Sequence, residues 1–200
     1  MRLRQMSRLV HAPVTAGHSF FTYRVSAPVR LDPDDRRRPD RGIQIRDVAE
    51  HLRDVRCAGP ADGRDRTVTG ISDDSRTVQP GDLYVALPGD RFHGLDFDAD
   101  AAARGAVAVL SDRSSRVLPT LIVDRPRDRV GGLASWIYGH PSHELQVHGV
   151  TGTNGKTSAT YLLDAALAAT GVVTGLIGGV VVRGPKSTRP ATHTTPEAVV

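Results

Sequence analysis

The feature that most constrains this chain is a short glycine-rich segment, Gly152-Thr153-Asn154-Gly155-Lys156-Thr157. It follows an apolar stretch, residues 147–151, and it precedes a stretch of helical spacing, residues 157–170, which ends at Gly171. A strand, a glycine-rich turn and a helix in this order are typical of a phosphate-binding loop. The glycines let successive backbone N–H groups converge on a phosphate, and the helix N-terminus adds partial positive charge. The segment therefore predicts a nucleotide-binding site in an α/β domain.

Two side chains of this loop are expected to act on the nucleotide. Lys156 can reach the outer phosphates, and Thr157 can offer its hydroxyl to Mg²⁺. The spacing departs from the common G-x-x-x-x-G-K-T form, because Val150 stands where the first glycine would be. A glycine-rich turn that contains a lysine by chance is the alternative, which the flanking strand and helix disfavour. The second Mg²⁺-binding acid of P-loop enzymes has no candidate here, since neither Asp164 nor Glu197 ends an apolar strand.

Upstream of the loop, strand and helix patterns alternate through residues 43–140, which predicts a separate α/β domain. Apolar spacing predicts helices at residues 45–52, 97–104 and 127–138. Strands are expected at residues 68–71, 83–87, 106–110 and 121–123, and further strands after the loop at 172–177 and 180–182. Gly105 is a suitable residue to end the second helix.

Residues 1–42 show no stable periodicity, and we expect a disordered leader or an upstream extension of the true start. Nine arginines and four acids fall in the first 41 residues, an excess that could indicate a nucleic-acid arm. The whole chain, however, holds 24 arginines and two lysines, without a basic motif interleaved with aromatic residues. This arginine bias points to GC-rich coding, and no nucleic-acid partner is expected.

Composition also restricts the compartment. Cys57 is the single cysteine, which excludes an intramolecular disulfide. No apolar run approaches the roughly 18 residues that span a bilayer. The N-terminus lacks an apolar segment followed by a cleavage site, as a secretory signal would have. We therefore expect a cytoplasmic protein that does not contact a membrane. We also expect the chain to be a monomer.

Three stretches of the chain resemble the Mur ligase family of peptidoglycan-building enzymes. GVTGTNGKTSATYLLDAAL, residues 149–167, is similar to the family's ATP-binding motif. GISDDSRTVQPGDLYVALPGDRFHGLDFDADAAARGAVAVL, residues 70–110, is similar to its amino-terminal domain, which carries a D-S-R turn and a P-G-D-L-[YF]-V-A-L strand. HTTPEAVV, residues 193–200, resembles the T-T-P-E element of the MurE members, which the MurF members lack.

The resemblance implies a fold and an activity. The fold would be α/β: a small MurE/MurF-type amino-terminal α/β domain at residues 43–140, which holds the UDP substrate, and then the truncated start of a P-loop parallel-sheet central domain at residues 141–200. The activity would be that of an ATP-dependent, amide-forming ligase. It adds diaminopimelate or lysine to UDP-MurNAc-L-Ala-D-Glu in peptidoglycan synthesis, and so serves cell shape and cell division.

The resemblance also implies site residues. The ATP and Mg²⁺ site would comprise Gly152, Thr153, Asn154, Gly155, Lys156, Thr157 and Ser158, with the metal on Thr157. The uridine-nucleotide site would comprise Ser75 together with Asp73, Asp90, Arg91 and Phe92. The muramoyl-dipeptide would meet His193, Thr194 and Thr195. Taken alone, the D-S-R segment could be a plain turn and the T-T-P segment a helix N-cap.

No catalytic residue is assigned in this chain. The family's Mg²⁺-binding glutamate, its carbamylated lysine and its third domain would lie beyond Val200, so we expect a fragment that is catalytically incomplete alone. One alternative is a non-catalytic module that binds UDP-MurNAc-peptides or regulates a full-length ligase. Another is a P-loop phosphotransferase unrelated to cell walls, which the D-S-R turn disfavours.

Overall fold

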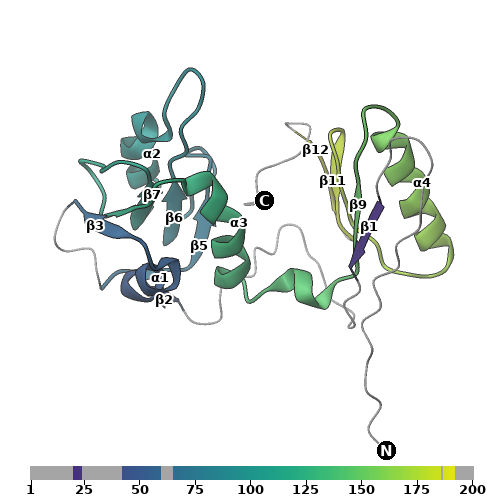
Figure 1. The fold of residues 1–200 in the computed structure, drawn as a ribbon, viewed down its shortest axis with the longest axis horizontal. Coiled ribbons are helices and arrows are strands. Elements are labelled where there is room, and N and C mark those ends of the chain that lie inside the picture. The colour runs from purple at the N-terminus through teal and green to yellow at the C-terminus, as the bar shows by residue number, and fades with distance from the viewer. Residues whose placement is uncertain (1–19, 24–41, 60–64, 186, 192–200) are drawn as a thin grey trace, which may run out of the picture. The chain divides into compact units, whose positions relative to one another are not determined.

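The structure is a computed structural model that describes residues 20–23, 42–59, 65–185 and 187–191 (Figure 1). The chain forms two compact units that divide between His140 and Pro141. The first unit holds a mixed α/β sheet with both faces covered, and the second holds the glycine-rich loop. Each unit is described by itself.

A five-stranded sheet in the order β3-β8-β7-β6-β5 forms the centre of the first unit. Its strands are β3 (Arg56–Ala58), β5 (Gly70–Ser72), β6 (Asp82–Val85), β7 (Ala108–Ser111) and β8 (Thr120–Ile122). The pairs from β5 to β8 are parallel, and β3 joins β8 in the antiparallel direction. A short antiparallel pair, β2 (Ile43–Gln44) with β4 (Thr67–Val68), lies beside the helix that follows β2. The parallel α/β sheet expected from the sequence is therefore present.

Helices cover the two faces of this sheet, because successive side chains of a strand point to opposite faces. In β6, Leu83 and Val85 pack with α1 (Ile45–Leu52) and α3 (Pro126–Ile137) in one cluster of buried residues. Tyr84 belongs to a second cluster with Ala101 of α2 (Asp98–Ala103). Burial on both faces explains why this strand is a continuous apolar run in the sequence.

The expected elements of this unit are present, with small shifts in their ends. The helix expected at residues 45–52 has the predicted bounds, and Gly105 ends α2 with φ +99°. The strand expected at residues 68–71 is instead two short strands, β4 and β5. The sequence did not predict β2 and β3, which are two and three residues long and too short to show a period.

The second unit contains β9 (Val147–Val150), the glycine-rich loop and α4 (Lys156–Ala169), as expected. Three short strands follow, β10 (Leu176–Ile177), β11 (Val181–Arg183) and β12 (Thr188–Pro190). They pair in sequence order as an antiparallel sheet. A short 3-10 helix, η3 (Pro141–Glu144), precedes β9.

The pairing of β9 differs from the parallel sheet expected for this unit. β9 pairs antiparallel with β1 (Phe20–Tyr23), and the strands of the unit that the structure describes have antiparallel partners only. Tight reversals favour this outcome, because parallel neighbours need a long crossover while β10, β11 and β12 follow one another closely. β1 lies within residues 1–42, where a disordered leader was expected; its aromatic and β-branched residues suit a strand. The rest of that stretch, except Gly42, lies outside the described residues.

Candidate functional site: a sheet edge and a glycine-rich loop

The residues expected to hold the uridine nucleotide come from two segments at one edge of the sheet. β5 and β6 are parallel neighbours, with Ser72 opposite Tyr84. The segments that leave their carboxyl ends, residues 73–77 and 86–93, therefore start side by side. In open α/β sheets this edge is where ligands bind. The structure thus brings Asp73 and Ser75 to the same edge as the loop that carries Asp90.

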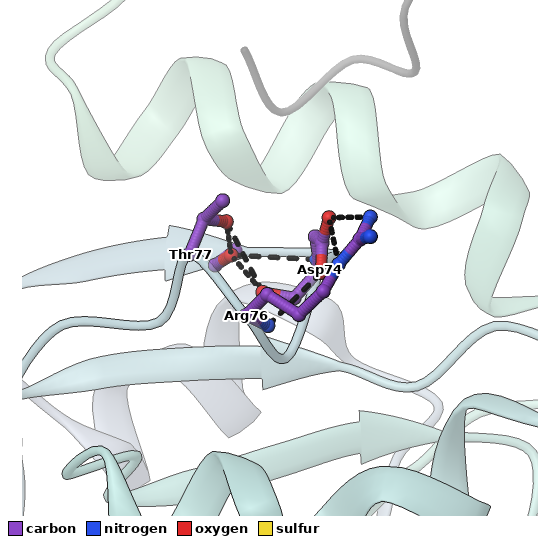
Figure 2. A network of polar contacts seen from close by, with 4 residues as sticks. Asp74, Arg76 and Thr77 are labelled. Carbon is purple, nitrogen blue, oxygen red and sulfur yellow. Dashed lines mark hydrogen bonds and ion pairs between the residues drawn. The ribbon is translucent and has the colours of Figure 1, made fainter. Parts of the chain in front are cut away.

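Local hydrogen bonds fix the turn after β5 (Figure 2). The Ser72 hydroxyl donates to the Asp74 carbonyl at 3.0 Å and lies 2.9 Å from the Thr77 hydroxyl. The Thr77 backbone N–H donates to the same carbonyl at 3.0 Å. The Asp74 carboxylate accepts the Arg76 backbone N–H at 2.9 Å, which is the Asx-turn arrangement of aspartate. The turn is therefore held in one shape before any ligand binds.

An ion pair across this turn occupies the guanidinium of Arg76. Arg76 Nη2 lies 2.6 Å from Asp74 Oδ2, and its Nε lies 2.9 Å from Oδ1. This hydrogen bonding from Arg76 lowers the pKa of Asp74, and Asp74 in turn raises the pKa of Arg76. Ser75, between them in the sequence, is only 8% exposed. The turn therefore holds a buried serine in place, while the charge of Arg76 is already balanced.

The loop after β6 presents three exposed side chains, Asp90, Arg91 and Phe92. The Gly89 N–H donates to the Phe92 carbonyl at 3.1 Å, which closes the loop tip. The Phe92 ring is 66% exposed and contacts the Phe97 ring edge to face, with 6.2 Å between centroids. A guanidinium and an aromatic ring on one short loop provide the groups that a diphosphate and a base require.

The base of this loop contains a residue that the sequence reasoning missed. The ring of His93 lies 2.9 Å from Asp112 through Nε2, and its Nδ1 accepts the Leu95 N–H at 3.0 Å. His93 begins the 3-10 helix η2 (Gly94–Phe97), where Asp96 accepts its backbone N–H at 2.9 Å. The pattern H-G-L-D is a capping box with histidine as the capping residue, a signal readable in the sequence.

The glycine-rich loop turns sharply into the N-terminus of α4. Gly155 precedes α4 with φ +77°, a left-handed conformation that favours glycine. Lys156 Nζ lies 2.5 Å from the Gly152 carbonyl and 3.3 Å from that of Thr153, so its charge stays at the loop. Thr157 and Ser158 are exposed on the first turn of α4. The expected ATP-binding residues are thus together at one helix N-terminus, where an anion is favoured.

The metal was expected on the hydroxyl of Thr157, which lies on the first turn of α4. Among the residues that the structure describes, no group of three or more His, Cys, Asp or Glu could hold a metal. Asp164, further along α4, is paired with Arg183 of β11. His193, Thr194 and Thr195 lie outside the described residues.

Comparisons with known proteins identify the protein family to which the chain belongs. The model of the Mur ligase family, catalytic domain, matches residues 67–138, and the model of the Mur ligase middle domain matches residues 150–200. The first match contains the sheet-edge segments, and the second contains the glycine-rich loop. The chain therefore belongs to the Mur ligase family.

Individual relatives narrow the comparison. UDP-N-acetylmuramoyl-L-alanyl-D-glutamate--2,6-diaminopimelate ligase of Streptomyces avermitilis is 52% identical over 141 residues, which are 68% of this chain and 28% of that protein. The protein of the same name from Streptomyces coelicolor is 50% identical over 137 residues, 66% of this chain and 27% of that protein. A solved structure of a ligase with this name is 20% identical, has a TM-score of 0.48, and is matched over 80% of this chain and 31% of its own. The chain thus spans 28% and 27% of the two Streptomyces relatives.

No helix in the described part of the chain is long and apolar enough to cross a membrane.

Proposed function

We propose that this chain supplies the UDP-substrate site and the ATP site of a MurE-type ligase in peptidoglycan synthesis. The observation that carries the proposal is the placement of the D-S-R turn and the Asp90–Phe92 loop at one sheet edge. The same chain has a glycine-rich loop that leads into the N-terminus of α4. The names of the curated relatives support UDP-N-acetylmuramoyl-L-alanyl-D-glutamate as the substrate. They favour 2,6-diaminopimelate over lysine as the added amino acid. We place the reaction in the cytoplasm and the chain as a monomer.

The proposed reaction forms one amide bond for each ATP that is consumed. A carboxylate oxygen of the substrate attacks the γ-phosphorus, and ADP leaves. The amine of the amino acid then attacks the acyl carbon, phosphate leaves, and the nitrogen loses a proton. Mg²⁺ would neutralise the phosphates and orient them for this transfer.

This chain's own residues would bind and orient the nucleotide. The backbone N–H groups of residues 152–158 would hold the phosphates, and Lys156 would balance their charge. Thr157 would contribute its hydroxyl to Mg²⁺. The short distance from Lys156 Nζ to two loop carbonyls supports this role, because it keeps the ammonium group where the phosphates would lie.

At the sheet edge, different side chains would contact different parts of the UDP moiety. Arg91 would pair with the diphosphate, since its exposed guanidinium can form bidentate bonds. Phe92 would offer its exposed ring to the base, and Ser75 would donate a hydrogen bond. Asp73 and Asp90 would accept hydrogen bonds from the substrate. Arg76 is not assigned a substrate contact, because Asp74 already occupies it. His193, Thr194 and Thr195 are proposed to contact the muramoyl-dipeptide.

The test is a binding experiment on the ¹⁵N-labelled full chain. UDP-N-acetylmuramoyl-L-alanyl-D-glutamate should shift the backbone amides of residues 74–76 and 90–92. Ser75→Ala should weaken binding about tenfold, the value of one hydrogen bond of about 1.4 kcal/mol. Ser142→Ala, in η3 of the other unit, is the control and should bind normally. Shifts confined to residues remote from the turn would contradict the site. A catalytically incomplete fragment and a non-catalytic module would both bind without turnover. Phosphate release in a coupled ATP assay that is lost in Lys156→Ala would therefore contradict the expected incompleteness.

A further inference from the structure

A buried histidine closes the base of the loop that carries Arg91 and Phe92. His93 is 8% exposed and bridges to Pro88 across the loop base. Its ring joins two elements, since Nδ1 accepts the Leu95 N–H and Nε2 lies 2.9 Å from Asp112 Oδ1. Asp112 directly follows β7. The ring therefore ties the end of the loop to the neighbouring strand.

The hydrogen bonds determine the tautomer of this ring. The backbone N–H of Leu95 can only donate, so Nδ1 of His93 accepts and carries no proton. A neutral imidazole has one N–H, which must then be on Nε2 and donate to the Asp112 carboxylate. The ring thus uses both nitrogens for structure, one as an acceptor and one as a donor.

The same network also reaches the beginning of the loop. Ser111, which is fully buried, donates from Oγ to the Ala86 carbonyl at 3.0 Å. Its Oγ also lies 3.3 Å from Asp112 Oδ1. Ala86 directly follows β6, where the loop starts. Both ends of the loop are therefore held from β7: one end by Ser111, its last residue, and the other by Asp112, which follows it.

Close packing leaves little freedom at this base. A Cβ on Gly94 would lie 2.6 Å from the Ala86 Cα, so no other residue fits without movement of the backbone. The Tyr84 hydroxyl donates to the Gly94 carbonyl at 2.9 Å. Arg127 of α3 donates to the Pro88 carbonyl at 3.2 Å. The loop base is fixed from three directions, whereas the tip is exposed.

We propose that His93 is a positioning residue for the UDP-substrate site. Its bond from Nε2–H to Asp112 sets the direction in which the loop presents Arg91 and Phe92. His93 acts through the loop and does not touch the substrate. The affinity readout of this proposal rests on the proposed function, while the loop geometry can be tested without a ligand.

Three substitutions in the full chain separate positioning from folding. His93→Asn keeps a capping acceptor for the Leu95 N–H, since asparagine is a good N-cap residue, but it has no donor that corresponds to Nε2. Asp112→Ala removes the acceptor of the Nε2–H bond. Asp112→Asn keeps an oxygen acceptor and is the conservative control.

The first readout is affinity for UDP-N-acetylmuramoyl-L-alanyl-D-glutamate. His93→Asn and Asp112→Ala should each weaken binding about tenfold, as loss of one hydrogen bond would. The double variant should bind no worse than either single variant, because both remove the same bond. Asp112→Asn should stay within about twofold of the unsubstituted chain, since its acceptor remains. Unchanged affinity in both single variants would overturn the proposal, even if their thermal unfolding midpoints were lower.

The second readout needs no ligand. ¹⁵N spectra of the imidazole should show His93 as the Nε2–H tautomer. His93→Asn and Asp112→Ala should shift the same amides of residues 89–92, and Asp112→Asn should leave them in place. If the unsubstituted chain does not bind the UDP compound while these shifts occur, the proposed function fails and the loop positioning stands. If the amides do not move, the positioning role is wrong.

Discussion

The two units of this chain have equally clear local patterns but differ in how they bury apolar surface. Among the residues whose burial the structure describes, which leave out β1, every buried apolar side chain except Leu176 belongs to residues 43–140. α1 buries three of its eight residues, whereas the fourteen residues of α4 include none that is buried. Tyr161 and Leu162, expected to share one helical face, are 40% and 71% exposed.

This contrast shows that a local sequence pattern specifies where a helix forms, whereas packing against other elements decides how much apolar surface the helix buries. Both helices form where the sequence predicts them. α1 and α3 face a five-stranded sheet that is wide enough to cover them. The antiparallel strands β10 to β12 are two or three residues long and offer a narrower surface to α4. Most of the stability of a helix in a protein comes from packing of its apolar face, so the first unit should carry most of the folding free energy.

The largest expected effect tests this difference in burial directly. Leu83→Ala, at a fully buried position of β6, should lower the free energy of unfolding by about 2–5 kcal/mol. Leu162→Ala removes the same atoms from an exposed position of α4 and should change it by no more than about 0.5 kcal/mol. Urea unfolding followed by far-UV circular dichroism measures both. Trp136, the single tryptophan, reports the first unit alone by fluorescence. Equal losses in the two variants would contradict the comparison.

A second prediction concerns the function of the second unit, which buries less apolar surface. Lys156→Ala should weaken binding of a fluorescent ATP analogue by about 1.5–3 kcal/mol, the range for a charge-assisted hydrogen bond. Fluorescence titration measures the affinity. Lys186→Ala removes the same charge elsewhere in the chain and should bind as the unsubstituted chain does. Equal affinity in all three proteins would show that the glycine-rich loop is not the phosphate site, whatever its shape.

The smallest expected effect concerns the turn after β5 in the first unit. The pKa of Asp74 is lowered in the folded chain, mainly by the hydrogen bond from Arg76. The pair therefore stabilises the fold above the ordinary carboxyl pKa, and this contribution is lost as pH falls through the lowered pKa. Carboxyl ¹³C NMR should show Asp74 titrating at a higher pH in Arg76→Ala. Arg116→Ala, which removes an exposed arginine, is the control. An unmoved titration would mean that the ion pair does not form in solution.

Short-range features of the sequence predicted most of these elements, and long-range pairings set those it missed. α1 follows from the apolar spacing of Ile45, Val48 and Leu52, which all become buried. The turn of the glycine-rich loop into α4 follows from six consecutive residues and their flanks. The pairing of β1 with β9, by contrast, joins segments more than 120 residues apart, and no local pattern encodes it. β12 ends in a proline and has no buried residue, so it lacks a strand pattern altogether.

In the candidate site, too, short-range features were predictable from the sequence and long-range contacts were not. Ser75 and the Asp90–Phe92 loop were expected from the resemblance to the Mur ligase family. Their common sheet edge follows from the parallel order of β5 and β6. Their assignment to a substrate stays a prediction. The contact between His93 and Asp112 depends on which strand lies beside β6, a choice that the sequence does not state. The capping pattern at His93 could have suggested a structural role, but it could not have identified Asp112 as the partner.

The closed base of the Asp90–Phe92 loop has a consequence for how such a site can diversify. The bonds that close it run through His93, Ser111 and Asp112 and use no side chain of residues 90–92. Substitutions at Asp90 and Arg91 therefore leave these bonds in place, whereas Phe92 also contacts the Phe97 ring of η2. A lineage can change the exposed groups at positions 90 and 91 without altering the residues that close the base of the loop. The positions that would contact a ligand can therefore change independently of the residues that hold the loop in place.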